Sequence, residues 1–168
     1  MKEILNYFNG TVWQQTELDK DVIKAVENAP AKIIDVGCGY NQYKQFNPDK
    51  LTGIDVANAN ADWVGDILNY KTDQIFQLAI CFGCLHFYNF EWVKIRFEKV
   101  LTLLSPHAII MMKVNPNIND KQPLTFFKYW TWPLVEHFAE VYKLKIEDRK
   151  EWKNPNNGSK RLKWTYIK

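Results

Sequence analysis

Two short clusters of glycine and aspartate lie about twenty residues apart and point to a nucleoside-binding site. The first spans Asp35 to Gly39 and reads DVGCG, and the second spans Gly53 to Asp55 and reads GID; each adjoins a short apolar run. Glycines at the turn that follows a strand permit positive φ and let a ligand approach the backbone closely. A carboxylate at the tip of the next strand can accept two hydrogen bonds from a ribose diol. The two clusters therefore predict a nucleoside-containing cofactor.

The residue types around these glycines argue against a phosphate-bearing cofactor. A nicotinamide-type fingerprint needs a third small residue three positions after the second glycine, and that position holds Gln42. The phosphate-loop pattern that ends in Gly-Lys-Ser/Thr is absent. An acidic residue close before the first glycine, Asp35, would repel a pyrophosphate. It suits a cofactor that carries cationic groups and no phosphate, so an NAD-dependent oxidoreductase is the less favoured alternative.

Alternating strands and helices are expected to position the two clusters. The hydrophobic patterns predict strands at about 32–36, 51–56, 63–64, 78–82 and 108–114. They predict helices at about 17–28, 89–104, 124–130 and 132–140, and a closing pair of alternating strands at about 141–150 and 160–167. Only residues 56–61 separate the second strand from the third, which is too short for a helical crossover, so the third strand should be vestigial.

This order of elements predicts an α/β fold with a doubly wound, Rossmann-like, mostly parallel sheet of seven strands and a C-terminal antiparallel hairpin. In such a sheet the ligand crevice lies beyond the carboxyl ends of the strands. The loops after Val36, Asp55, Phe82 and Val114 are therefore the places to seek chemistry.

The ordered motifs resemble those of the class I S-adenosylmethionine-dependent methyltransferases. Residues 33–39, which read IIDVGCG, are similar to motif I of that family. The likeness continues through GID at 53–55, GDI at 65–67, CFGCLH at 81–86 and VLTLLSP at 100–106, and covers about 17–167. The third glycine of motif I is Asn41 here, and asparagine tolerates left-handed backbone better than most residues.

By this resemblance, S-adenosylmethionine is the expected cofactor, and its methionine portion and ribose would contact the loop after the first strand. Asp35 and the Gly37–Gly39 backbone, with Cys38 between the glycines, would hold these parts. Asp55 would take both ribose hydroxyls, with Val56 next to it in the site.

The resemblance also assigns the adenine end and the acceptor side. Asp66 would contact the adenine amino group, Ile67 would lie beside the ring, and Phe82 and Gly83 would line the floor. His86 follows the fourth strand, where the family often places groups that face the methyl acceptor. We expect it to act as a general base, since histidine is the usual base near neutral pH. The alternative is a rim residue that shapes the pocket.

Other constellations carry less weight. Cys38, Cys81 and Cys84 with His86 form a possible three-cysteine, one-histidine metal set, but a lone C-x-x-C lacks the second pair that makes zinc spacing persuasive. We expect free thiols and no metal. One aromatic group after the fifth strand and another near the N-terminus either cover the ligands or pack in the core: Phe126, Phe127, Tyr129, Trp130 and Trp132, and Tyr7, Phe8 and Trp13.

Charge and composition limit the remaining classes. The net charge of +3 is uneven, because residues 141–168 hold nine Lys/Arg and three Asp/Glu. Those charges alternate with apolar residues, as on the solvated face of a strand, so a nucleic-acid partner is weakly supported. No apolar run approaches the ~18 residues of a membrane span, and we expect a cytoplasmic protein that does not enter a membrane.

The 168 residues predict one methyltransferase-like domain over 1–168, with an N-terminal helical segment at 1–30 and a core at 31–168. The expected function is transfer of a methyl group from S-adenosylmethionine to an unidentified small-molecule acceptor. The first alternative is a non-catalytic S-adenosylmethionine-binding module or partner subunit. An NAD-dependent oxidoreductase is the second. The oligomeric state cannot be read from the sequence.

Overall fold

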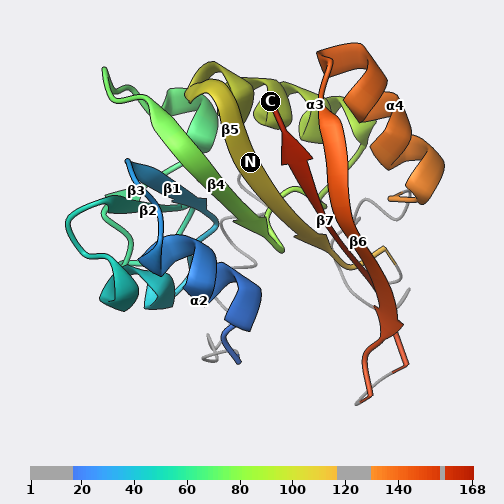
Figure 1. Cartoon of the computed structure of the whole chain (residues 1–168), viewed down its shortest axis with the longest axis horizontal. Coiled ribbons are helices and arrows are strands. Elements are labelled where there is room, and N and C mark those ends of the chain that lie inside the picture. The colour runs from blue at the N-terminus through green and yellow to red at the C-terminus, as the bar shows by residue number, and fades with distance from the viewer. Residues whose placement is uncertain (1–16, 117–129, 156–157) are drawn as a thin grey trace.

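The computed structural model describes residues 17–116, 130–155 and 158–168, and within them a single sheet has the strand order β3-β2-β1-β4-β5-β7-β6 (Figure 1). The strands are β1 (Ile33–Val36), β2 (Leu51–Asp55), β3 (Trp63–Val64), β4 (Phe76–Phe82), β5 (Leu104–Val114), β6 (Lys145–Lys153) and β7 (Lys160–Ile167). β1 to β5 pair in parallel, and β7 runs antiparallel to both β5 and β6. This confirms the predicted doubly wound sheet, its two-residue third strand and its C-terminal hairpin.

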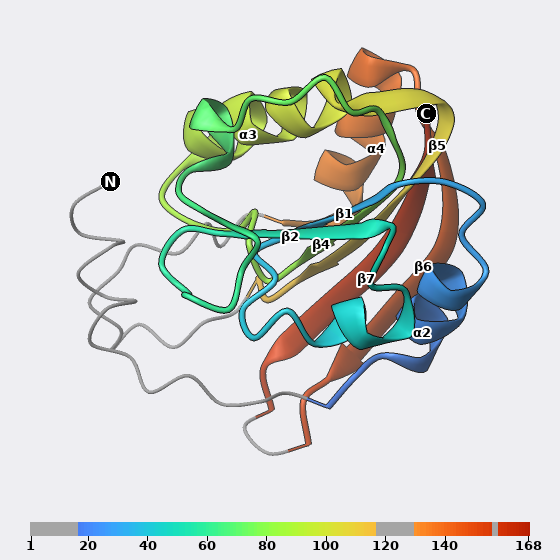
Figure 2. The ribbon, with the colours of Figure 1, turned by 90° about the vertical axis from the view of Figure 1, so that its left-hand side faces the viewer.

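Helices cover both faces of the sheet, as Figure 2 shows. They are α2 (Lys20–Glu27), α3 (Phe90–Thr102) and α4 (Trp132–Tyr142). α3 and α4 pack on one face over the larger hydrophobic core, and α2 packs on the other over a smaller core that includes Ile33, Ile80 and Met111. Side chains alternate between the two faces of the sheet along each strand, so those of Ile33 and Asp35 both face α2.

Side chains at the helix starts satisfy backbone donors. Asn89 caps α3, and its Oδ1 accepts from the N–H of Trp92 at 2.9 Å. The expected first helix begins later than predicted, at Lys20, because Asp19 is the residue that accepts from the free N–H groups of its first turn. Residues 1–16, which include Tyr7, Phe8 and Trp13, lie outside the described residues.

Two predicted boundaries were wrong, each for a local reason. The helix expected to reach 104 ends at Thr102, and β5 begins at Leu104 instead of 108, with an irregular register where His107 adopts φ 62°. The strand expected from 141 begins at Lys145, because α4 continues to Tyr142, whose ring packs on Phe138. Lys143, at φ 55°, then ends that helix with left-handed backbone.

The connections beside the predicted site are short. Between β1 and β2 the chain forms only a five-residue 3₁₀ helix, η1 (Gln42–Phe46). A second 3₁₀ helix, η2 (Ile67–Asn69), follows β3. No helix separates β2 from β3, as the short spacing predicted.

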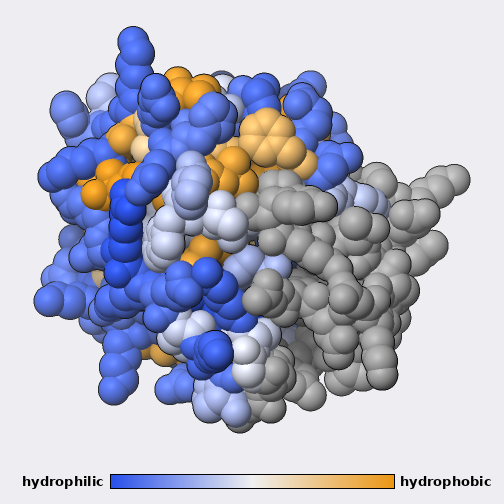
Figure 3. All heavy atoms as spheres, turned by 90° about the vertical axis from the view of Figure 1, so that its right-hand side faces the viewer, coloured by the Kyte–Doolittle hydropathy of each residue, from blue (hydrophilic) through white to orange (hydrophobic). Residues whose placement is uncertain are grey.

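Most basic residues of the C-terminal hairpin are paired with acidic ones. These ion pairs are Lys145–Glu147, Arg149–Glu136, Lys150–Asp21, Lys160–Glu151 and Lys163 with Asp19 and Asp21. Figure 3 shows the β6 side of the molecule as a mainly hydrophilic surface with a smaller hydrophobic area. These pairs neutralise most of the positive charges of the hairpin. Across the described ranges, no helix has the length and apolarity that a membrane crossing requires.

Candidate functional site

The loop after β1 turns sharply where the loop after β4 crosses it. Gly37 adopts φ 71°, and its N–H donates to the carbonyl oxygen of Ile54 at 2.7 Å. A Cβ atom placed on Gly37 would lie 2.4 Å from the Cβ atom of Cys84. Both the left-handed backbone and this close approach require glycine, so Gly37 lets the loops after β1 and β4 pack directly against each other at the tip of β1.

Asp55 at the tip of β2 holds both neighbouring loops in place. Its Oδ2 accepts from the N–H of Gly39 at 3.0 Å, and its Oδ1 accepts from the N–H groups of Ala57 and Asn58, each at 3.0 Å. A carboxylate offers about four acceptor positions, so roughly one stays available to a ligand. Sequence reasoning gave Asp55 a ligand role only and missed this structural role, which depends on contacts between loops.

Asn41 replaces the third glycine of the motif and preserves the turn. It lies in left-handed backbone at φ 55° and ψ 35°, as its residue type allows. Its Nδ2 donates to the carbonyl oxygen of Asn60 and to Oδ2 of Asp62, each at 3.2 Å, and the same Oδ2 accepts from the N–H of Gly53 at 2.8 Å. These bonds tie the glycine-rich loop to the segment between β2 and β3.

Asp35 is a buried carboxyl group in this loop, with 3% of its surface exposed. Burial, and to a smaller degree the nearby Asp55 charge, raises the pKa of Asp35 to about 8. The group is therefore mostly protonated at pH 7. A cation placed beside it would restore the charge, so the position suits a ligand with a positive group.

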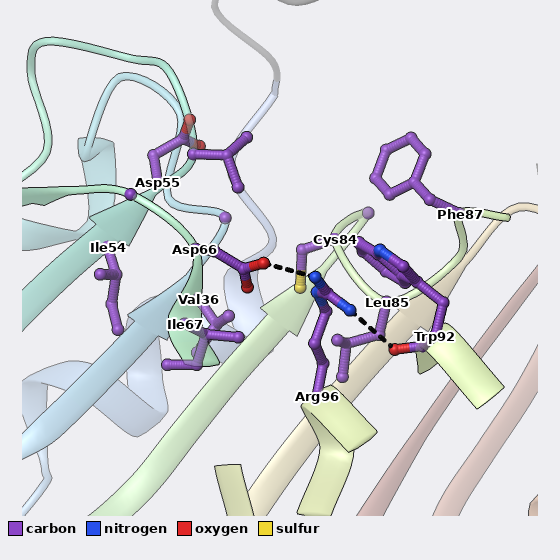
Figure 4. Close-up of a pocket in the computed structure, with 14 residues that line it drawn as sticks. Val36, Ile54, Asp55, Asp66, Ile67, Cys84, Leu85, Phe87, Trp92 and Arg96 are labelled. Carbon is purple, nitrogen blue, oxygen red and sulfur yellow. Dashed lines mark hydrogen bonds and ion pairs between the residues drawn. The ribbon is translucent and has the colours of Figure 1, made fainter. Parts of the chain in front are cut away.

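The glycine-rich loop divides a crevice into two cavities that both reach Gly37 and Gly83. The first, of about 610 Å³, lies at the tips of β1 and β2 next to α3 (Figure 4). Its lining includes four more of the predicted cofactor residues: Asp55, Val56, Asp66 and Ile67. Phe87, Trp92 and Arg96 also line this cavity and were not predicted.

The second cavity, of about 720 Å³, lies at the tips of β1, β4 and β5. It contains three further predicted residues, Asp35, Cys38 and Phe82, together with Lys113, which was not predicted. Of the ten predicted cofactor-binding residues, only Gly39 lines neither cavity; it contributes through its N–H bond to Asp55.

A buried ion pair crosses the first cavity. Oδ2 of Asp66 pairs with the guanidinium group of Arg96, and Oδ1 of Asp66 accepts from the N–H of Leu68 at 3.2 Å. The guanidinium group also lies 3.8 Å from the ring centroid of Trp92 and donates to the Trp92 carbonyl oxygen at 3.3 Å (Figure 4). The signal in the sequence was an arginine on the inward stripe of α3, one residue before Phe97.

His86, the predicted base, is buried beside the ring of Phe87, with 4.7 Å between the ring centroids. It lines neither of the two cavities. Burial, and to a smaller degree the charge of Arg161, lowers the pKa of His86 to about 3, so the ring is neutral at pH 7. Its catalytic role stays a prediction.

The cysteines of the crevice are protonated thiols. Burial raises the pKa values of Cys38 and Cys84 above their usual range. Within residues 17–116, 130–155 and 158–168, no three histidine, cysteine, aspartate or glutamate residues are arranged to hold a metal ion.

The aromatic residues after β5 divide into a described and an undescribed part. Trp130 is fully buried, and its Nε1 donates to the carbonyl oxygen of Leu85 at 2.8 Å, with Phe138 and Trp164 packed around it. For Trp130 the packing alternative is therefore correct. Phe126, Phe127 and Tyr129 lie outside the described residues.

No family model and no curated protein matches this chain. Solved structures match its fold. A magnesium protoporphyrin IX methyltransferase from Synechocystis PCC 6803, with bound S-adenosylhomocysteine, has a TM-score of 0.71 at 11% identity over 99% of this chain and 98% of its own. A 1,6-didemethyltoxoflavin-N1-methyltransferase from Burkholderia thailandensis, also with S-adenosylhomocysteine, has a TM-score of 0.69 at 17% identity over 89% and 79%. The cyclase SpnF has a TM-score of 0.65 at 15% identity over 88% and 78%. At these identities the likeness shows the fold.

Proposed function

We propose that this chain, which has the class I methyltransferase fold, binds S-adenosylmethionine and transfers its methyl group to a small-molecule acceptor. The observation that carries the proposal is the divided crevice at the tips of β1, β2 and β4. Both cavities reach Gly37, and Asp35 lines one of them while Asp55 lines the other. Solved structures with the same fold hold S-adenosylhomocysteine, which supports this choice of cofactor.

The residues present fit the chemical parts of this cofactor. Asp35 needs a cation to regain its charge, and the cofactor carries an ammonium and a sulfonium group without any phosphate. The remaining acceptor position of Asp55 suits one ribose hydroxyl. To accept from both hydroxyls, the carboxylate must lengthen one of its hydrogen bonds to the backbone. The apolar walls of the first cavity, including Ile67, Phe87 and Trp92, suit a flat adenine ring.

S-adenosylmethionine supplies a methyl group that its sulfonium sulfur already activates, so no covalent protein intermediate is needed. The chain's own residues would orient the reactants and exclude water from the reacting atoms. Asp35 and the Gly37 backbone fix one end of the crevice, and Phe82 lines the second cavity. Solved structures with this fold include methyltransferases named for small-molecule substrates, which supports a small-molecule acceptor.

His86 remains our candidate base for acceptors that must lose a proton. The neutral ring can accept a proton, but a base with a pKa of about 3 is weak at pH 7. We therefore propose that His86 acts only if acceptor binding exposes it. A His86→Gln variant would then lose turnover and its dependence on pH, and a purely structural role would change stability without altering the pH profile.

The strongest alternative is a module that binds S-adenosylmethionine without turnover. The short η1 connection and the missing helix between β2 and β3 favour this module, because fewer residues then surround the crevice and shield it from water. A protein named as a cyclase shares the fold, so the fold leaves the reaction open. An NAD-dependent oxidoreductase is less favoured because Gln42 occupies the position where its fingerprint needs a third small residue.

Ligand-induced thermal shifts with S-adenosylmethionine, S-adenosylhomocysteine and NADH test the proposal. A ligand at about 100 times its dissociation constant stabilises the folded chain by roughly 2.7 kcal/mol. We expect shifts with the two adenosylated amino acids, and a loss of those shifts in Asp55→Asn but not in the exposed control Asp73→Asn. A response to NADH alone would end the proposal. Binding without transfer of labelled methyl to any of a broad acceptor panel would favour the module.

A further inference from the structure

The second cavity holds a lysine that the likeness to methyltransferases does not assign. Lys113 lies near the end of β5, next to Phe82 of β4 on one side and Lys163 of β7 on the other. Met111, two residues earlier, belongs to the small core under α2. Because side chains alternate along a strand, Lys113 faces the α2 side as well, where it lines the second cavity.

The two neighbouring lysines differ in their partners. Nζ of Lys163 lies 2.7 and 2.9 Å from the two carboxylate oxygens of Asp19 and 2.7 Å from Oδ2 of Asp21. Lys113 makes no ion pair with any residue in the described part of the chain. Its Nζ lies 5.0 Å from the ring centroid of Phe82. A positive charge opposite another on paired strands is unfavourable unless an anion compensates it.

The surroundings of Lys113 support the need for an anion. Burial is the main cause that lowers its pKa, and the charges of Lys163 and Arg161 act in the same direction. Asp19 and the exposed Glu17 act in the opposite direction, and burial outweighs them. An anion bound in the cavity would stabilise the ammonium form.

Asp35 lines the same cavity and is an acidic group without a basic partner among the described residues. It faces the α2 side from β1, two strands away from Lys113 and level with Met111. With strands about 4.8 Å apart and a rise of about 3.3 Å per residue, the two backbones lie roughly 12 Å apart across the sheet. Lys113 in turn makes no ion pair in the described part of the chain, although the exposed Glu17 lines the same cavity. A ligand that carries an ammonium and a carboxylate on one carbon complements both.

We propose that Lys113 binds the carboxylate of the amino-acid end of S-adenosylmethionine, while Asp35 faces the ammonium group of that same end. This inference rests on the proposed function and adds a residue to the cofactor site. It makes Lys113 a specificity residue, because it would favour ligands that keep the amino-acid group over adenosine thioethers that lack it. The other source of a carboxylate in this cavity is the methyl acceptor.

Titration calorimetry with two ligands separates these sources. S-adenosylhomocysteine keeps the amino-acid group, and 5′-methylthioadenosine lacks it. In Lys113→Met we expect S-adenosylhomocysteine to bind about tenfold to a hundredfold more weakly, as for the loss of a charged hydrogen bond, with 5′-methylthioadenosine changed less than twofold. Lys113→Arg should keep most of the affinity. Lys71→Met is the matched control, since it removes the same charge at an exposed position that lines neither cavity.

Three results would overturn the inference, and one of them also overturns the proposed function. Equal weakening of both ligands in Lys113→Met would assign Lys113 to the structure of the site. Unchanged binding of S-adenosylhomocysteine would leave the proposed function intact and point to the acceptor as the source of the carboxylate. Failure of the unmodified chain to bind either ligand would remove the proposed function and the inference with it.

Discussion

Ligand binding at Asp35 should release protons, and the structure sets how many. The pKa of this buried carboxyl is about 8 in the ligand-free chain, so it carries about 0.9 protons at pH 7. An ammonium group within about 4–6 Å lowers a carboxyl pKa by roughly 1–3 units. The bound pKa would then lie between about 5 and 7, where the group carries about 0.01 to 0.5 protons at pH 7. Binding should therefore release roughly 0.4 to 0.9 protons.

Calorimetric titration of S-adenosylhomocysteine at pH 7 in phosphate and in Tris measures this number, because the two buffers differ in ionisation enthalpy. Asp35→Asn is the test variant, since it keeps the shape and removes the titrating group. The released protons should disappear in this variant and persist in the control Asp73→Asn. Release below 0.1 protons in the unmodified chain, or equal release in Asp35→Asn, would refute the role given to Asp35.

The same pKa predicts how stability depends on pH. A carboxyl whose folded pKa of about 8 exceeds its unfolded value of 3.8 binds more protons in the folded chain between these values. Asp35 therefore lowers the free energy of unfolding as pH rises from about 4 to 8. At pH 7 the difference of about three units corresponds to about 4 kcal/mol, so Asp35→Asn should stabilise the ligand-free chain by up to that amount. Urea denaturation at pH 5 and 8 measures it; equal stability of both chains at pH 8 would contradict the burial argument.

Three further substitutions test the site. Gly37→Ala should destabilise the chain and abolish binding of S-adenosylhomocysteine, because its Cβ atom would lie 2.4 Å from that of Cys84 at φ 71°; calorimetry showing normal affinity would contradict this. Asp55→Asn should lower the free energy of unfolding by about 1–3 kcal/mol, since an amide nitrogen cannot accept the backbone bonds; urea denaturation without a loss would disprove the structural role. Arg96→Met should lower it by about 3–5 kcal/mol by leaving Asp66 buried and unpaired. The double variant with Asp66→Asn should regain part of that loss, and strict additivity would show that the pair is uncoupled.

The sequence was sufficient where local pattern and chain topology decide the outcome. The glycine-rich loop, the adjoining Asp55 and the missing helix before β3 followed from residue types and spacing. The left-handed turn at Asn41 was also anticipated, because asparagine tolerates that conformation. Parallel strand order then placed nearly all the predicted cofactor residues along one crevice.

The sequence was insufficient where contacts between distant segments decide. Arg96 and Asp66 are thirty residues apart and meet only because α3 packs beside η2. Lys113 becomes distinctive through the pairing of its neighbour Lys163 with α2, which no local pattern reveals. The alternation around Tyr142 fitted a strand, but Tyr142 ends α4 instead, where its ring packs on Phe97 of α3 and its hydroxyl donates to Oε1 of Glu98 at 2.9 Å.

A crystal structure of the full chain with S-adenosylhomocysteine tests the central claim most directly. The account predicts the adenine ring in the cavity beside Ile67 and Trp92, a ribose hydroxyl on Asp55, and the amino-acid end between Asp35 and Lys113. A ligand bound at another surface, or an empty crevice at saturating ligand, would contradict it.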